Sequence, residues 1–150
     1  ATQREPSMLN LNAAQAIVSS TLAHARETNF KPMAVVVLDA RGAPKAAAVE
    51  DGTSLKRFEV AHGKAHGALA LGMGSRSIFK RAKDQAFFVA AISHVSGGAL
   101  VPVPGGVLIR DDAGEVIGAV GVSGDTSDND EAAACSAIQA AGLKADPGSD

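Results

Sequence analysis

The sequence lacks tryptophan and tyrosine, and its aromatic residues are five phenylalanines. Its single cysteine, Cys135, excludes an internal disulfide framework and a structural zinc site built from several thiolates. No segment approaches the roughly eighteen consecutive apolar residues that a membrane-spanning helix needs. We therefore expect no membrane partner. The many alanines and valines predict a core of small side chains at close backbone distances.

Neither sign of charge dominates, because 14 basic and 16 acidic residues give a formal net charge of −2 at pH 7. A protein that binds the phosphate backbone needs a concentrated basic surface, so this balance argues against a nucleic-acid partner. The length of 150 residues predicts a single domain over residues 1–150. The cytoplasm is the favoured compartment, and a secreted or periplasmic location stays open.

Apolar spacing and turn residues predict the order of the elements. They indicate helices at residues 11–28 and 54–71, a third helix beginning at residue 75, a loop at 93–104, a last helix ending near 142, and strands at 33–39, 43–50, 106–110 and 115–122. The run at residues 33–39 is continuously apolar and β-branched, which is typical of a central strand. Hairpins separated by helices predict an α+β protein with an antiparallel sheet of about five strands flanked by helices.

Caps and chain ends complete this prediction. Polar residues that can cap helices stand before each predicted helix, namely Asn10 or Asn12, Ser54, Ser75, and Thr126 or Ser127. Gly72 and Gly142 provide left-handed stops for the second and last helices. Residues 1–7 and 146–150 are expected to be loose ends.

Two histidines on the second predicted helix form the first candidate site. His62 and His66 stand four residues apart, so they share one helix face, and Glu59 lies near the same flank. Two imidazoles and a carboxylate with open positions suit a divalent metal such as non-haem iron. The alternative is a pair of boundary histidines with ordinary polar partners.

Haem is the second candidate ligand. Two histidines on one helix turn cannot approach the same iron from opposite faces, so either His62 or His66 would act as a single proximal ligand. His94 in the predicted loop is an independent candidate. Gly97 and Gly98 offer backbone N–H groups to an anion, although they equally fit simple turn geometry.

Lys64 and two glycines mark the other sides of this helix. Lys64 lies at the flank opposite the histidines, where it either extends to solvent or reaches a bound anion. Gly63 and Gly67 share an outer face, and each costs about 1 kcal/mol in a helix interior relative to alanine. Such a face indicates the close approach of another backbone. We infer a partner chain there, and hence a homo-oligomer.

The C-terminal half carries a family resemblance. The segment VPVPGGVLIRDDAGEVI at residues 101–117, followed by GAVGVSG at 118–124 and DNDE at 128–131, resembles the GlcG/HbpS family, also called the haem-degrading domain family. The opening Leu9-Asn10-Leu11, the strand at 33–39, and Lys64-Ala65 followed by Gly72 support it, so that the match covers about residues 9–143. The resemblance implies a profilin-like α/β sandwich, homo-oligomers and, in some members, haem binding.

Three functional hypotheses follow. The first is a homo-oligomeric, non-enzymatic binder of haem or a related tetrapyrrole, with His62, His66 or His94 as ligand. The second is an enzyme acting on a small organic acid or aromatic metabolite, in which Lys64 holds a carboxylate or phosphate. In that enzyme Glu59, His62 or His66 transfers protons, with or without a divalent metal. The third is a scaffold subunit whose glycines serve only oligomer packing.

Overall fold

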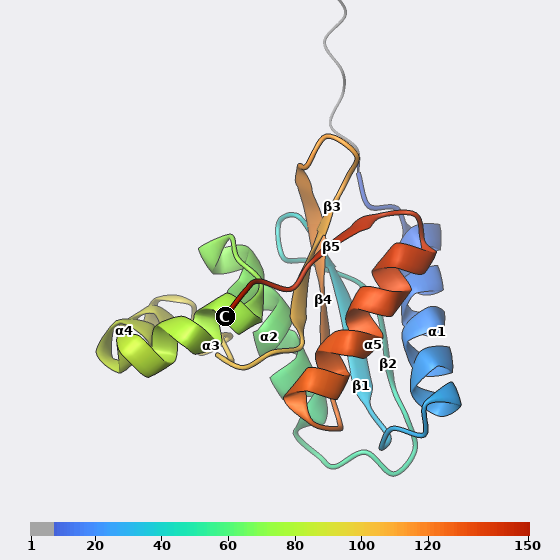
Figure 1. The fold of residues 1–150 in the computed structure, drawn as a ribbon, viewed down its shortest axis with the longest axis horizontal. Coiled ribbons are helices and arrows are strands. Elements are labelled where there is room, and N and C mark those ends of the chain that lie inside the picture. Colours follow the sequence, from blue (N-terminus) through green and yellow to red (C-terminus); the bar gives the residue numbers. More distant parts are fainter. Residues whose placement is uncertain (1–7) are drawn as a thin grey trace, which may run out of the picture.

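The computed structural model describes residues 8–150, so the predicted loose end at residues 1–7 lies outside the described part. A five-stranded antiparallel sheet forms the centre of the fold, with strand order β2-β1-β4-β3-β5 (Figure 1). Its strands are β1 (Ala34–Asp39), β2 (Pro44–Val49), β3 (Gly106–Arg110), β4 (Val116–Ser123) and β5 (Lys144–Asp146). The predicted α+β class and the flanked antiparallel sheet are confirmed.

Helices cover both faces of this sheet. The helices α1 (Leu11–Glu27) and α5 (Ser127–Ala140) lie on one face, and α2 (Arg57–Leu71) lies on the other (Figure 1). Alternate residues of β1 serve the two layers, because Val35 and Val37 pack with α1 and α5 whereas Val36 and Leu38 pack with α2. All four are completely buried, which confirms the predicted central strand.

Glycines in the sheet allow α2 to lie unusually close to it. A Cβ atom at Gly121 would stand 1.9 Å from the carbonyl oxygen of Ala61, and one at Gly106 would stand 2.2 Å from that of Lys64. No side chain fits at such distances. The backbone of α2 therefore rests directly on β3 and β4, as the small-residue composition predicts.

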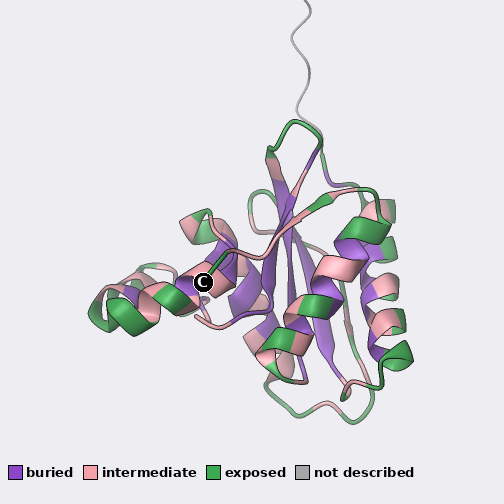
Figure 2. Cartoon of the chain, viewed as in Figure 1, coloured by how far each residue is buried: buried purple, intermediate pink, exposed green. Residues whose placement is uncertain are grey.

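The predicted third helix is two helices, α3 (Ser75–Asp84) and α4 (Ala86–Val95), which project from the side of the sheet (Figure 1). The break falls at Gln85, whose φ of −141° and ψ of 63° are not helical. Its backbone N–H donates to Arg81, and its side-chain oxygen accepts from the Arg81 Nε. Figure 2 shows that α4 remains mostly exposed, with only Val89 buried.

The structure confirms some of the predicted helix caps and contradicts others. Asn10 caps α1 by accepting the Ala13 N–H at 2.8 Å, and Thr126 caps α5 by accepting the Asn129 N–H at 3.2 Å. Gly72 and Gly142 are left-handed as predicted, with φ of 69° and 77°. The predicted side-chain caps at Ser54 and Ser75 are wrong. Lys56 and Gly74 occupy those cap positions and make no side-chain cap bond.

The C-terminal segment is not loose, contrary to the sequence-based expectation. Residues Lys144–Asp146 form β5, which pairs with β3 at the sheet edge. Beyond it, Arg76 donates to the carboxylate of Asp150, and Ser77 accepts the Ser149 N–H at 2.9 Å. These contacts fasten the end of the chain to α3, a long-range pairing that local sequence does not signal.

Candidate functional site

Three rings stack along a half-buried flank of α2. Phe58, His62 and His66 follow at intervals of four residues, so their side chains point the same way. The ring centroids of Phe58 and His62 lie 6.5 Å apart, and those of His62 and His66 lie 5.6 Å apart. The helix thus presents an aromatic and imidazole ladder, in agreement with the shared face predicted for the two histidines.

The segment between α4 and β3 packs along α2, as expected for an apolar loop rich in glycine and proline. Val101 donates its N–H to the Gly63 carbonyl at 3.1 Å. A Cβ atom at Gly63 would stand 2.6 Å from Val101 Cγ2, and one at Gly67 would stand 2.9 Å from Leu100 Cγ. The predicted close approach is therefore confirmed. However, the approaching backbone belongs to this chain and not to a second copy, so the glycines give no support to an oligomer.

His66 is held in place by this segment and by the β1–β2 turn. Its Nδ1 lies 2.9 Å from the Ala99 carbonyl oxygen, which requires a proton on Nδ1. On the other side, a Cβ atom at Gly42 would stand 3.5 Å from the His66 ring. The ring is thus enclosed between two backbone segments, and its role in the fold is to tie them to α2.

His62 opens instead onto a groove of about 440 Å³. The groove is lined by seven residues from α2, the loop after α4 and the start of β2: Pro44, Phe58, Glu59, His62, Gly97, Gly98 and Ala99. Burial and the neighbouring His66 both lower the pKa of His62 from its usual value of 6.5. The imidazole is therefore neutral at pH 7 and can offer a lone pair to a metal centre.

The glycines on the loop side form an open wall of this groove. Gly97 and Gly98 have φ of 68° and 84°, values that favour glycine, and a Cβ atom at either would meet nothing within 4 Å. Because glycine has no side chain, these two positions leave room for a flat ligand against the Phe58 and His62 rings. The sequence pointed to these two glycines, but it gave no signal that Pro44 and Ala99 would join them.

The structure does not support the predicted metal triad. Among residues 8–150, no three His, Cys, Asp or Glu side chains are placed to hold a metal ion together. Glu59 is 60% exposed and lies 4.0 Å from the ammonium of Lys56. The Glu59 carboxylate thus lies near a cation of its own helix, and the Nδ1 of His66 is bonded to the Ala99 carbonyl oxygen.

Lys64 points into the protein, so the first of its two predicted alternatives, extension to solvent, is wrong. Its side chain is 2% exposed, and its Nζ lies 3.1 Å from Asp130 and 2.9 Å from the Val122 carbonyl oxygen. Burial lowers the pKa of Lys64 and raises that of Asp130, while the opposite charge of each partner counters the shift. Its anion is therefore supplied by α5 of the same chain.

His94 lies apart from the groove-lining residues. It belongs to the last turn of α4 and is exposed, so its predicted loop location is wrong. The carbonyl oxygen of His94 accepts the Gly97 N–H at 3.0 Å, which starts the turn toward the groove. Of the predicted site residues, the structure brings together Glu59, His62, Gly97 and Gly98.

Comparison with protein-family models shows to which family the chain belongs. The family model described as haem degrading protein HbpS-like matches residues 9–139. The chain belongs to this HbpS-like family. Comparison with curated proteins gives no match.

Solved structures show the same fold as this HbpS-like chain. The Klebsiella pneumoniae protein ORFY is 22% identical, with a TM-score of 0.79 over 95% of this chain and 98% of that one. The PduOC:heme complex is 22% identical, with a TM-score of 0.81 over 91% and 97% of the two chains. HbpS is 20% identical, with a TM-score of 0.78 over 92% and 93%. No helix within residues 8–150 of the HbpS-like chain is long and apolar enough to cross a membrane.

Proposed function

We propose that this HbpS-like protein binds haem or a related tetrapyrrole in the groove beside α2, where His62 would hold the iron. The carrying observation is that His62 alone among the α2 histidines faces the groove, with a lowered pKa that keeps its imidazole neutral. The HbpS-like family description and the heme complex of the PduOC neighbour support the choice of ligand. The iron of a bound haem supplies redox and ligand-binding chemistry.

The groove residues suit a flat, largely apolar ligand. Phe58 offers a ring face beside His62, and Gly97 and Gly98 leave open space on the other side. The volume of about 440 Å³ falls within the range of small-molecule sites, roughly 300–1,000 Å³. His66 does not line the groove, and its Nδ1 is bonded to the Ala99 carbonyl oxygen, so we assign it the role of positioning the loop.

A homo-oligomer forms the second half of the proposal, supported by α4. This helix is apolar along most of its length, yet Phe87 and Val95 are 78% and 79% exposed. Contiguous exposed apolar patches are typical of surfaces that associate with another protein or a ligand. We assign this surface to a second copy of the chain, in place of the glycine face that the sequence had indicated.

Haem titration of the purified apo-protein tests the binding half. We expect a saturable shift of the Soret band for the wild-type protein and for His94→Ala, whose histidine lies outside the groove. His62→Ala should weaken binding by about tenfold or more, and added imidazole should restore a ligated spectrum. A wild-type spectrum from His62→Ala would overturn the assignment of His62. The absence of any saturable shift in the wild-type protein would overturn the proposed function.

A further inference from the structure

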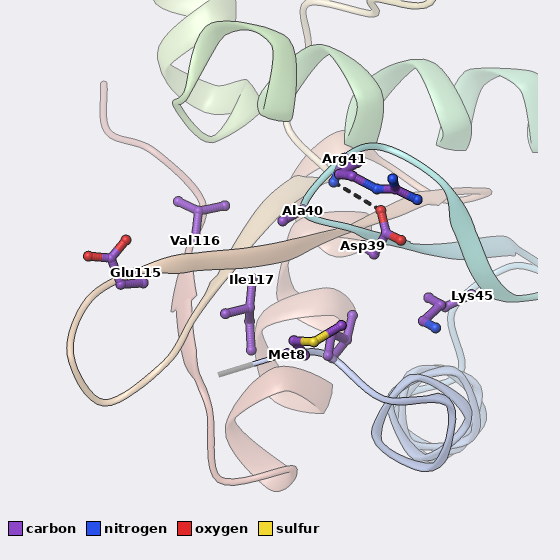
Figure 3. A pocket seen from close by; sticks show the side chains of 9 residues that line it. Met8, Asp39, Ala40, Arg41, Lys45, Glu115, Val116 and Ile117 are labelled. Atoms are coloured by element: carbon purple, nitrogen blue, oxygen red, sulfur yellow. Dashed lines mark hydrogen bonds between the residues drawn. The ribbon is translucent and has the colours of Figure 1, made fainter. Parts of the chain in front are cut away.

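A second cavity lies at the end of the sheet where turns join β1 to β2 and β3 to β4. Figure 3 shows it, with Arg41 and Lys45 toward one end and Glu115 at the other. Its volume is about 250 Å³. None of its lining residues belongs to the haem groove beside α2.

Two β-bulges build this cavity. In β2, Ala46 pairs with Val37 and Pro44 pairs with Leu38, so that Lys45 is an extra residue without a partner in β1. In β4, Val116 pairs with Arg110 and Gly118 with Ile109, which leaves Ile117 as the extra residue. Bulges re-aim side chains at the rims of sheets and beside functional sites. Both extra residues, Lys45 and Ile117, line the cavity.

The cations at the cavity lack counter-ions. No ion pair within residues 8–150 joins Arg41 or Lys45 to a carboxylate. Asp39 also lines the cavity, but its Oδ1 accepts the backbone N–H groups of Arg41 at 2.9 Å and of Ala43 at 3.0 Å. The guanidinium and the ammonium are therefore available to an anion from outside the chain.

The rest of the lining is apolar. Leu9 and Ile117 are buried at 4% and 6% exposure, and Met8 and Val116 complete the wall. The exposed carboxylate of Glu115 at the opposite end disfavours a second negative charge on a ligand. Arg41 and Lys45 outnumber the single carboxylate of Asp39, so the cavity combines an end with a net positive charge, an apolar middle and an anionic end.

We propose that this cavity is a second binding site, which takes a small monocarboxylate with a short apolar body. The carboxylate lies against Arg41 and Lys45, and the apolar body lies against Leu9, Val116 and Ile117. A cavity of about 250 Å³ accommodates a branched chain of a few carbons but not a tetrapyrrole. The site is separate from the proposed haem groove and does not depend on it.

Backbone amide NMR with 4-methylpentanoate as the probe tests this site on the apo-protein. We expect saturable shifts at Ala40, Lys45 and Ile117, and about tenfold weaker binding of the uncharged 4-methylpentanamide. The double variant Arg41→Gln/Lys45→Met should lose about tenfold in affinity for the carboxylate. The matched variant Lys83→Gln, with its lysine on α3, should bind as the wild type does.

The role of Glu115 gives an independent readout. Hexanedioate carries a second carboxylate, so we expect wild-type protein to bind it about threefold more weakly than Glu115→Gln does. Equal affinity for the acid and its amide, or an equal loss in Lys83→Gln, would overturn the proposal. Shifts that do not saturate, or that fall outside the cavity amides, would overturn it as well. Haem titration is unaffected by any of these outcomes, so the two proposals fail separately.

Discussion

The ammonium of Lys64 and the carboxylate of Asp130 form an ion pair at 3.1 Å in which neither side chain is more than 2% exposed. The pair joins α2 to the first turn of α5, across the end of β4, where Lys64 also donates to Val122. Asp130 in turn accepts the Asp125 N–H at 2.9 Å. One buried contact therefore connects the two helical layers past the end of the central strand β4.

Breaking this pair should be strongly destabilising. Lys64→Met leaves a buried carboxylate and Asp130→Asn leaves a buried ammonium, so each should lower the free energy of unfolding by about 3–5 kcal/mol. The double variant should lose less than the sum of the two, because it leaves no uncompensated charge. Urea unfolding of the four proteins in the cycle measures the coupling. Strict additivity would show that the two groups do not stabilise each other.

Gly67→Ala tests how tightly the loop packs on α2. The new Cβ would stand 2.9 Å from Leu100 Cγ and 3.2 Å from Leu100 Cα, so the loop backbone must shift. We expect a net loss of about 1 kcal/mol, because overpacking exceeds the gain in helix propensity. Chemical denaturation measures the change, with Ala70→Ser on the exposed side as the control. A gain of about 1 kcal/mol would mean that the loop does not constrain this position.

The pH dependence of His62 has a defined sign. Because its folded-state pKa is lowered, the unfolded chain binds more protons as the pH falls below 6.5, and the folded state loses stability there. We expect this contribution to be fully present above pH 6.5 and lost as the pH falls through the folded-state pKa. His66→Gln removes the neighbouring charge and should raise the His62 pKa. NMR titration of the His62 imidazole measures its pKa in the wild type and in His66→Gln. A His62 pKa above 6.5 in the wild type would contradict the structure.

The exposed side of α4 predicts a change in assembly. Phe87→Glu places a charge on the apolar surface and should yield a smaller species by size exclusion with light scattering. Leu55→Glu, at a residue that is 87% exposed near the start of α2, should leave the assembly unchanged. A wild-type protein that is monomeric throughout the concentration series would refute the oligomer, and an equal effect of both variants would refute the choice of α4.

Local patterns carried much of the fold prediction. The continuous apolar run in β1 signals burial on two faces, and Asn10, Thr126 and Gly72 act through bonds or dihedral angles confined to a few residues. Interruptions were harder to predict, as the break at Gln85 shows, because the helical spacing of apolar residues continues from α3 into α4. The residues beyond α5 pair with β3 and α3, and the local sequence contains no signal for these distant partners.

The sequence by itself determined the helical face that His62 and His66 share, since a spacing of four aligns side chains in any α-helix. It also determined that Gly63 and Gly67 admit a close backbone. Only the tertiary structure decided that this backbone is the chain's own loop, which occupies His66 and leaves His62 facing the groove. It likewise decided that Lys64 turns inward to Asp130. The orientations of these side chains depend on contacts between segments that are distant in the sequence. Burial and the position of a counter-ion decide them, and local spacing does not.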